Sequence, residues 1–130
     1  MQEESSQQLG KIGEAIAQKY LQDKHWELIA RNWKPVKRKI RGVRGEIDIV
    51  ARDPLNSQIV FIEVKTLKQP NLDDLKPEDH FTNKKFSKLK TLAQLFLIEH
   101  RIKNEHRIDL IAVNMFKGKH NIAHYQGIIL

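Results

Sequence analysis

The sequence predicts an α/β domain in which a mixed sheet is flanked by helices. Residues 6–21 and 84–100 carry apolar side chains at the spacing of amphipathic helices. Residues 46–51 alternate apolar with polar side chains and are rich in β-branched residues, and residues 58–66 contain Ile59, Val60, Phe61, Ile62 and Val64; both patterns are typical of strands. The order of helix, hairpin, helix and strand is that of a sheet with helices packed on it.

Length and composition predict a single domain over residues 1–130. The chain has 130 residues, close to the commonest domain size, and hydrophobic residues make up 40% of it, too many for a disordered chain. Cysteine is absent, which excludes disulfides, thiolate metal sites and cysteine nucleophiles.

The charge of the chain favours a polyanionic partner. Lys and Arg number 23 against 16 Asp and Glu, so the net charge is +7. Such a surplus favours nucleic acid as the partner, and a well-solvated surface without a partner is the alternative. The N-terminus lacks the features of a signal peptide, and no apolar stretch has the length of a membrane span. We therefore expect a cytoplasmic protein with no membrane partner.

The first predicted helix places an acidic residue at the edge of its apolar stripe. Ser5 or Ser6 is expected to cap this helix, and Ile12 and Ile16 belong to the stripe. Glu14 sits beside the stripe, at the border between core and solvent. A carboxylate in that position can take part in a site.

Two basic segments are candidates for phosphate contact. Residues 26–33 indicate a short strand or turn, and residues 34–44 follow as a basic loop or irregular hairpin tip. The candidate nucleic-acid-binding residues are Lys37, Arg38, Lys39, Arg41 and Arg44 in that loop, and Lys84 and Lys85 at the start of the second helix. The alternative for both segments is a solvated charged surface.

The two central strands are expected to pair as a hairpin across a turn at residues 53–57. Each strand carries two polar residues two positions apart, namely Glu46 and Asp48 in the first and Glu63 and Lys65 in the second. Side chains two apart share a face, so carboxylates from both strands can meet. The alternatives are the solvent face of an amphipathic hairpin and a plain salt bridge to Lys65.

The remaining elements complete the sheet. Residues 68–83 are expected to form a loop, and Thr82 is a plausible cap for the second helix, residues 84–100. Residues 107–116 indicate another strand, and the tail from His120 is expected to add an edge strand.

The acidic residues suit a divalent cation. Asp48 and Glu63, with a backbone carbonyl, form an oxygen ligand set suited to Mg²⁺ or Mn²⁺, and Glu14 can complete it. Lys65 can neutralise charge on a phosphate and orient or deprotonate a water. The six histidines lack the spacing of a helical zinc motif and are expected not to be ligands. Asp109 is expected to be a structural ion-pair partner.

These residues carry a resemblance to known nucleases. Asp48, followed in the next strand by Glu63-Val64-Lys65, resembles the PD-(D/E)xK signature of restriction-endonuclease-like nucleases. Over residues 9–116 the chain is also similar to the YraN family of uncharacterised bacterial proteins. The segments that carry this similarity are Gly10-x-x-Gly13-Glu14, Ala17, Tyr20-Leu21, Arg31-Asn32-Trp33, Gly45 to Val50, Val60 to Thr66, Lys84-Lys85 and Arg107 to Leu110.

The resemblance implies a restriction-endonuclease-like fold and a nucleic-acid substrate. The archaeal Holliday-junction resolvases, which the chain also resembles, use a helix glutamate, an aspartate and a Glu-x-Lys in this order. By that resemblance Glu14, Asp48 and Glu63 are metal ligands and Lys65 is the catalytic lysine of a Mg²⁺-dependent or Mn²⁺-dependent endodeoxyribonuclease acting on branched or otherwise structured DNA. Leu67 departs from the family, which commonly has an arginine there.

Two other functions are compatible with the same residues. One is a nucleic-acid-binding module that keeps the nuclease fold and does not cleave. The other is a basic domain that binds an acidic protein. Because nucleases that cut both strands are often dimers, analogy also suggests a homodimer.

Overall fold

The computed structural model describes residues 5–36, 44–68 and 77–130. The helices and strands of this part are α1 Ser6–Asp23, β1 Glu27–Trp33, β2 Ile47–Arg52, β3 Ile59–Leu67, α2 Pro77–His80, α3 Asn83–Glu99, β4 His106–Phe116 and β5 Lys119–Tyr125. Four of the candidate DNA-binding residues, Lys37, Arg38, Lys39 and Arg41, lie outside the described residues.

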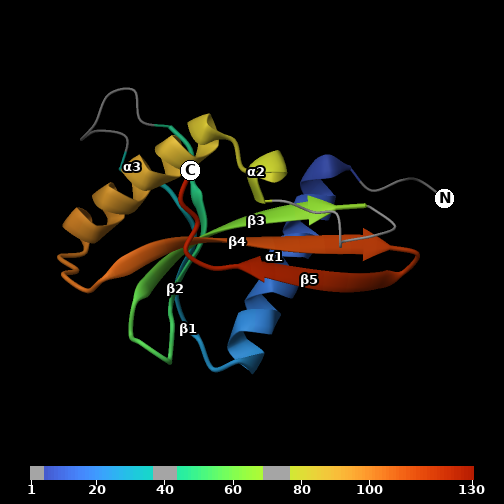
Figure 1. Ribbon diagram of the computed structural model, residues 1–130, viewed down its shortest axis with the longest axis horizontal. Helices are drawn as coiled ribbons and strands as arrows, with labels where there is room; N and C mark the ends of the chain where they lie inside the picture. Colours follow the sequence, from blue (N-terminus) through green and yellow to red (C-terminus); the bar gives the residue numbers. More distant parts are fainter. Residues whose placement is uncertain (1–4, 37–43, 69–76) are drawn as a thin grey trace.

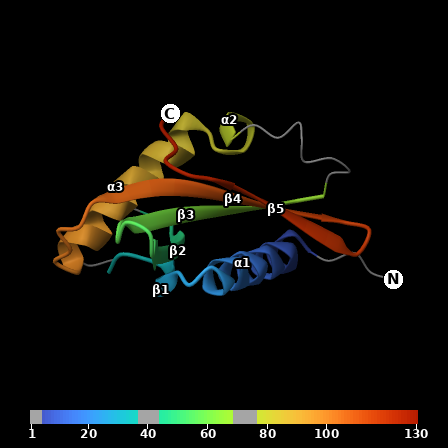
Figure 2. The same cartoon turned by 60° about the horizontal axis from the view of Figure 1, so that its bottom comes forward.

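The five strands form one mixed sheet in the order β1-β2-β3-β4-β5. Neighbouring strands are antiparallel except β3 and β4, which are parallel and are joined by the segment that contains α2 and α3. Helix α1 covers one face of the sheet and α3 covers the other (Figures 1 and 2). The predicted α/β class is confirmed, and this architecture is compatible with a restriction-endonuclease-like fold.

The predicted hairpin is present, and the chain ends in a second hairpin. Strands β2 and β3 pair from Ile49 opposite Ile62 to Arg52 opposite Ile59. Strands β4 and β5 are joined by two residues, Lys117 at φ 52° and Gly118 at φ 73°. Positive φ at both positions is what a two-residue hairpin turn requires to match the twist of its strands. The expected edge strand is therefore confirmed as β5.

Alternation along β3 divides the core into two layers. Phe61 packs in the cluster beneath α3, and its neighbour Ile62 packs in the cluster beneath α1. Because alternate residues share a face, Glu63 is directed to the α3 face and Thr66 to the α1 face. The central strand therefore presents polar side chains to both helices.

The helix caps agree with the sequence, and one predicted loop does not. Ser5 caps α1, with its hydroxyl accepting from the Gln8 amide at 3.1 Å, and Thr82 caps α3. The prediction of a continuous loop over residues 68–83 is wrong, because α2 begins at Pro77. Proline is favoured at the first position of a helix, and this was the available signal.

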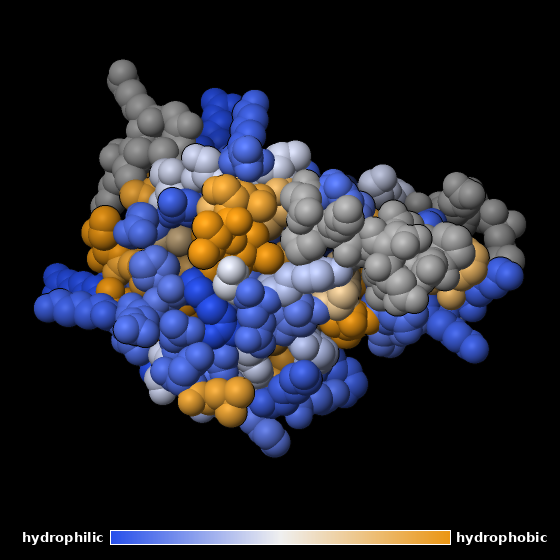
Figure 3. All heavy atoms as spheres, in the orientation of Figure 1, coloured by the Kyte–Doolittle hydropathy of each residue, from blue (hydrophilic) through white to orange (hydrophobic). Residues whose placement is uncertain are grey.

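The surface in the view of Figure 3 is mainly hydrophilic, with separate apolar patches. The exposed large apolar residues of the described part are Val36, Leu55, Ile98, Phe116, Ile129 and Leu130. In the same part of the chain, none of the helices combines the length and the apolar character needed to cross a bilayer.

Candidate metal centre

Helix α1 packs so closely on β3 that it has little room to shift relative to the strand. A Cβ atom added to Gly13 would overlap the Thr66 hydroxyl and would lie 3.0 Å from Thr66 Cβ. The buried residues Ala17 and Leu21 continue the same face of the helix. This contact places the next residue, Glu14, above the strands β1 and β2.

Three carboxylates converge beside α1. Glu14 from α1, Glu46 from the residue before β2 and Asp48 from β2 each offer an oxygen, and these oxygens lie within 4.8 Å of one another. We call these three residues the acidic cluster. Within residues 5–36, 44–68 and 77–130 no histidine belongs to such a group. Carboxylate oxygens at this spacing are a suitable ligand set for Mg²⁺ or Mn²⁺.

Glu46 is the residue that sequence reasoning missed. The sequence pattern identifies it as a polar neighbour of Asp48 and does not assign it to the site. It precedes β2 and follows Gly45, whose φ is +118°, so strand alternation does not fix its direction. The available signal was its position two residues before Asp48 in the chain.

Asp48 lies where β2 and β3 stop pairing. The ladder reaches Ile49 opposite Ile62, and the Asp48 carboxylate then accepts a hydrogen bond from the Val64 amide at 2.8 Å. This bond fixes one carboxylate oxygen between the strands. Burial, and next the charge of Glu63, raise the pKa of Asp48 from 3.8 to about 8. The other carboxylate oxygen of Asp48 therefore lies in a partly buried site surrounded by further negative charge, which disfavours its ionised form.

Glu14 also carries an elevated pKa, for related reasons. Burial and the neighbouring Glu46 raise the pKa of Glu14, while a hydrogen bond from Asn32 and the charge of Arg31 oppose the increase. Crowded carboxylates share protons when no cation is present, and a divalent cation replaces those protons. The acidic cluster therefore has the electrostatic character of a cation site.

Glu63 lies on the other side of the sheet from Glu14. It is outside the acidic cluster, and it lines a cavity of about 170 Å³ together with Glu46, Lys85 and Lys88. Burial raises the pKa of Glu63, and the charges of Lys85 and then Lys65 oppose that effect. Glu63 acts on Asp48 electrostatically, so the two acids from neighbouring strands belong to one charged centre.

A second cavity opens on the α1 side of the acidic cluster. It has a volume of about 200 Å³ and is lined by Lys11, Glu14, Ala15, Gln18, Arg31, Asn32, Asp48 and Ile49. Arg31 is held there by Gln18, which accepts from its guanidinium at 2.9 Å. The carboxylates are thus reached from two sides, each bordered by basic side chains.

Asn32 has an unusual backbone for a strand residue. Its φ is +47°, in the left-handed region that asparagine tolerates better than most side chains. With the backbone in this conformation, the side chain of Asn32 is hydrogen-bonded to the Glu14 carboxylate. Asn32 therefore belongs to the site through Glu14.

The remaining predicted site residues divide into two groups. Lys65 is partly buried on β3, and Lys85 reaches Glu63 from α3. Arg44 and Lys84 are exposed, and no contact of theirs with the acidic cluster is found within the described residues. The assignment of these four residues to catalysis or DNA binding stays a prediction.

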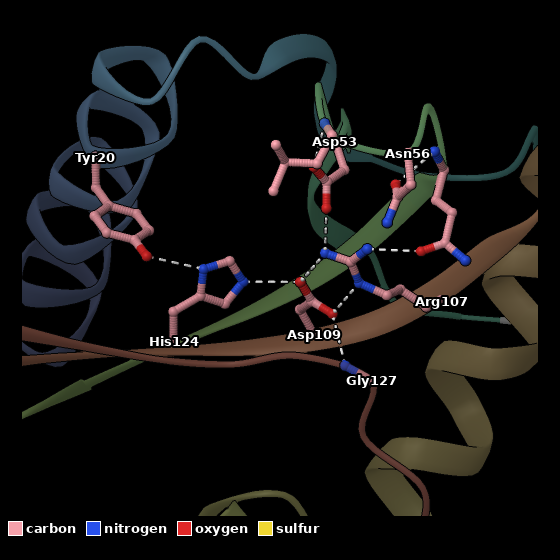
Figure 4. A network of polar contacts seen from close by, with 9 residues as sticks. Tyr20, Asp53, Asn56, Arg107, Asp109, His124 and Gly127 are labelled. Carbon is pink, nitrogen blue, oxygen red and sulfur yellow. Dashed lines mark hydrogen bonds and ion pairs between the residues drawn. The ribbon is translucent and has the colours of Figure 1, made fainter.

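A second polar cluster joins α1 to the far strands (Figure 4). Arg107 contacts the buried Asp53 at 2.8 Å and the fully buried Asp109 at 3.0 Å. His124 on β5 links α1 to β4: its Nε2 lies 2.8 Å from the Asp109 carboxylate of β4, and its Nδ1 lies 3.0 Å from the Tyr20 hydroxyl of α1. The prediction that Asp109 is an ion-pair partner is confirmed. Because these groups satisfy one another, the cluster is structural.

Comparison with known proteins identifies relatives along most of the chain. The profile described as "Uncharacterised protein family UPF0102" matches residues 13–113. A UPF0102 protein of Beutenbergia cavernae is 34% identical over 122 residues, covering 92% of this chain and 94% of that protein. A UPF0102 protein of Thermotoga petrophila is 32% identical over 120 residues, covering 92% and 95%. One from Roseiflexus castenholzii is 35% identical over 109 residues, covering 82% and 79%.

Proposed function

We propose that this chain, which belongs to the uncharacterised protein family UPF0102, also known as the YraN family, is a metal-dependent nuclease that hydrolyses DNA phosphodiesters. The observation that carries the proposal is the convergence of Glu14, Glu46 and Asp48 to within 4.8 Å, with Glu63 electrostatically linked to them. Three converging acids with a fourth linked to them electrostatically, in a chain with a net charge of +7, favour a site for a cation and a polyanion together.

The acids hold the cation in this proposal. Glu14, Asp48 and Glu63 are the proposed ligands, and Glu46 is added to them on the strength of its position. A bound Mg²⁺ or Mn²⁺ would polarise the phosphate and lower the pKa of an attacking water. Asp48 is fixed by the Val64 amide, so its orientation is set before any ligand arrives.

The lysines act on the phosphate. Lys65 shares a strand face with Glu63, two residues away, and is the proposed catalytic lysine. Its ammonium neutralises charge that develops on the phosphate and orients the water. Lys85 approaches Glu63 from α3 and adds positive charge on the same side. DNA is proposed as the polyanion, because phosphates spaced along a strand suit basic groups on both sides of the carboxylates.

A cleavage assay tests the proposal. The protein is incubated with branched, single-stranded and duplex DNA in Mg²⁺ or Mn²⁺, alongside Glu63→Ala and Lys65→Ala. Each substitution is expected to lower cleavage at least about a hundredfold. Glu99→Gln, an exposed carboxylate at the far end of α3, is the matched control and keeps the wild-type rate. Cleavage that survives both site substitutions contradicts the proposal.

Two outcomes distinguish the alternatives. Binding of DNA that needs no metal, without cleavage of any substrate, identifies a binding module of the same fold. Absence of binding to any nucleic acid at low salt identifies a basic domain that binds an acidic protein. Mn²⁺ titration by calorimetry separates these from the nuclease, because only the nuclease requires the acidic cluster to bind the ion.

A further inference from the structure

The cavity between α3 and β3 has features of a phosphate site. It is lined by Gly45, Glu46, Glu63, Lys85, Lys88, Leu89 and Leu92, and we call it the α3 notch. Two lysines one turn apart on α3 supply its positive charge, and two leucines from the same helix supply its apolar wall. A cavity of about 170 Å³ admits a small polar group such as a phosphate and no base pair.

Both lysines are directed into the α3 notch. Lys85 lines the cavity together with Glu63, and its positive charge opposes the raised pKa of that acid more than the charge of Lys65 does. The end of Lys88 lies across Gly45, with Cε 2.6 Å and Nζ 3.0 Å from the place that a Cβ atom on Gly45 would take. Gly45 thus leaves the room in which the Lys88 ammonium lies.

The other lysines of α3 lie elsewhere. Lys90 lines two cavities on the opposite side of the helix and lies 5.9 Å from the centre of the Phe86 ring. Lys84 lines none of the cavities described for this part of the chain. In Figure 3 long hydrophilic side chains project above the N-terminal half of α3. Among the lysines of α3, and within the cavities described for residues 5–36, 44–68 and 77–130, Lys85 and Lys88 are the two that line a cavity together with Glu46 and Glu63.

We propose that Lys85 and Lys88 form a subsite for a phosphate of the nucleic acid next to the one that is cleaved. This inference rests on the proposed function, because Glu46 belongs both to the α3 notch and to the acidic cluster. A phosphate in the notch would meet two ammonium groups, and Glu63 would repel it until a cation neutralises that acid. The structure therefore assigns metal and phosphate to adjoining sites whose occupancies support each other.

The test measures DNA binding apart from cleavage. Ca²⁺ replaces Mg²⁺, and the affinity of the full chain for a short labelled oligonucleotide is measured from about 50 to 200 mM salt. Log affinity falls as log salt increases, and each lost phosphate contact makes this fall less steep by about 0.7 for single strands and about 0.9 for duplex. We expect that loss in Lys85→Met and in Lys88→Met.

Matched variants keep the test specific. Lys90→Met removes an equal charge from the same helix and is expected to keep the wild-type slope. Lys85→Arg and Lys88→Arg keep the charge and are expected to restore it. Thermal unfolding of each variant verifies that the chain is folded. An oligonucleotide with and without a 5′-phosphate shows whether the notch takes an internal or a terminal phosphate.

The outcomes separate this inference from the nuclease. Equal slopes for Lys85→Met, Lys88→Met and the wild type overturn the α3 notch, even if Glu63-dependent cleavage is observed. An equal loss in Lys90→Met also overturns it, because the whole helix then acts as a diffuse basic surface. The predicted slopes without cleavage of any substrate support the notch and contradict the nuclease. Absence of binding contradicts both.

Discussion

Gly13 of α1 and Thr66 of β3 are in such close contact that only a glycine fits. A Cβ atom on Gly13 would overlap Thr66 Oγ1 and approach Thr66 Cγ2 to 3.1 Å. Gly13→Ala is therefore expected to move α1 off the sheet and to lower the free energy of unfolding by about 1–3 kcal/mol. Because Glu14 moves with the helix, the affinity for Mn²⁺ should fall as well. Denaturant unfolding and calorimetry measure the two effects.

Gly10 provides the control for that substitution. It lies on the same helix, and a Cβ atom there would meet nothing within 4 Å. Gly10→Ala should raise the free energy of unfolding by about 0.5–1 kcal/mol, because alanine favours the helix. Removing the Thr66 hydroxyl in Gly13→Ala/Thr66→Ala should recover part of the loss. Equal stability of the two single variants would show that α1 adapts without strain.

Asn32 is expected to affect cation binding more than stability. Asn32→Gly keeps a residue that tolerates φ +47° and removes the hydrogen bond that lowers the pKa of Glu14. The Mn²⁺ affinity at neutral pH should fall severalfold while the unfolding midpoint changes little. Asn32→Ala removes the same bond and adds roughly 1–2 kcal/mol of backbone strain. If both variants bind Mn²⁺ like the wild type, Asn32 does not position Glu14.

Asp48 predicts an unusual pH dependence of stability. Its pKa in the folded chain, about 8, exceeds the ordinary value of 3.8, so the folded chain holds the extra proton between these values. Without metal, stability should therefore be highest near pH 4 and should fall as pH rises through about 8. Asp48→Asn should reduce that decline, part of which remains because burial also raises the pKa values of Glu14 and Glu63, and should raise the metal-free melting temperature at pH 7 by roughly 5 °C. Thermal melts in EDTA measure both effects.

Cation binding should show the opposite dependence on pH. Because Mn²⁺ replaces the proton on Asp48, its apparent affinity should increase with pH up to about 8. Calorimetry in two buffers of different ionisation enthalpy reports the protons released. Binding without proton release would contradict the assignment of Asp48 as a ligand.

The cluster around Arg107 predicts loss of stability in acid. Burial opposes ionisation of Asp109, but hydrogen bonds from His124, Arg107 and the Gly127 amide hold the pKa of Asp109 below 3.8. Its contribution is present above that value and is lost as pH falls through the folded pKa. Asp109→Asn should lower the free energy of unfolding at pH 7 by about 3–5 kcal/mol, since Arg107 loses a buried partner. Below pH 4 the free energy of unfolding of this variant should also depend less on pH than that of the wild type, as measured by urea unfolding.

The fold could largely be predicted because its periodicities are local. Helical spacing predicted α1 and α3 within two residues at each end, and alternation predicted the β2–β3 hairpin. The parallel pairing of β3 with β4 depends on the packing of α3 across the sheet and leaves no local pattern. The short helix α2 was missed because its four residues are too few for a period.

The candidate site could be predicted in part. The chain order of Glu14, Asp48, Glu63 and Lys65 is readable from the sequence, and the structure brings Glu14 and Asp48 together. The placement of Glu63 on the α3 side was not predictable, because alternation gives relative faces and does not show where two strands separate. Lys88 joins the notch through its tertiary contact with Gly45, which no local sequence pattern reveals.

The central position of β3 has a consequence for how the protein opens. This strand is hydrogen-bonded to β2 on one edge and to β4 on the other, where Glu63 is paired with Leu110. Amide protons of β3 from Ile59 to Ile62, which lies next to Glu63, should exchange with solvent only when most of the sheet opens, whereas those of α1 can exchange through detachment of the helix alone. Slow deuterium uptake in β3 beside faster uptake in α1 would mean that Glu14 leaves and returns while the other acids stay in place.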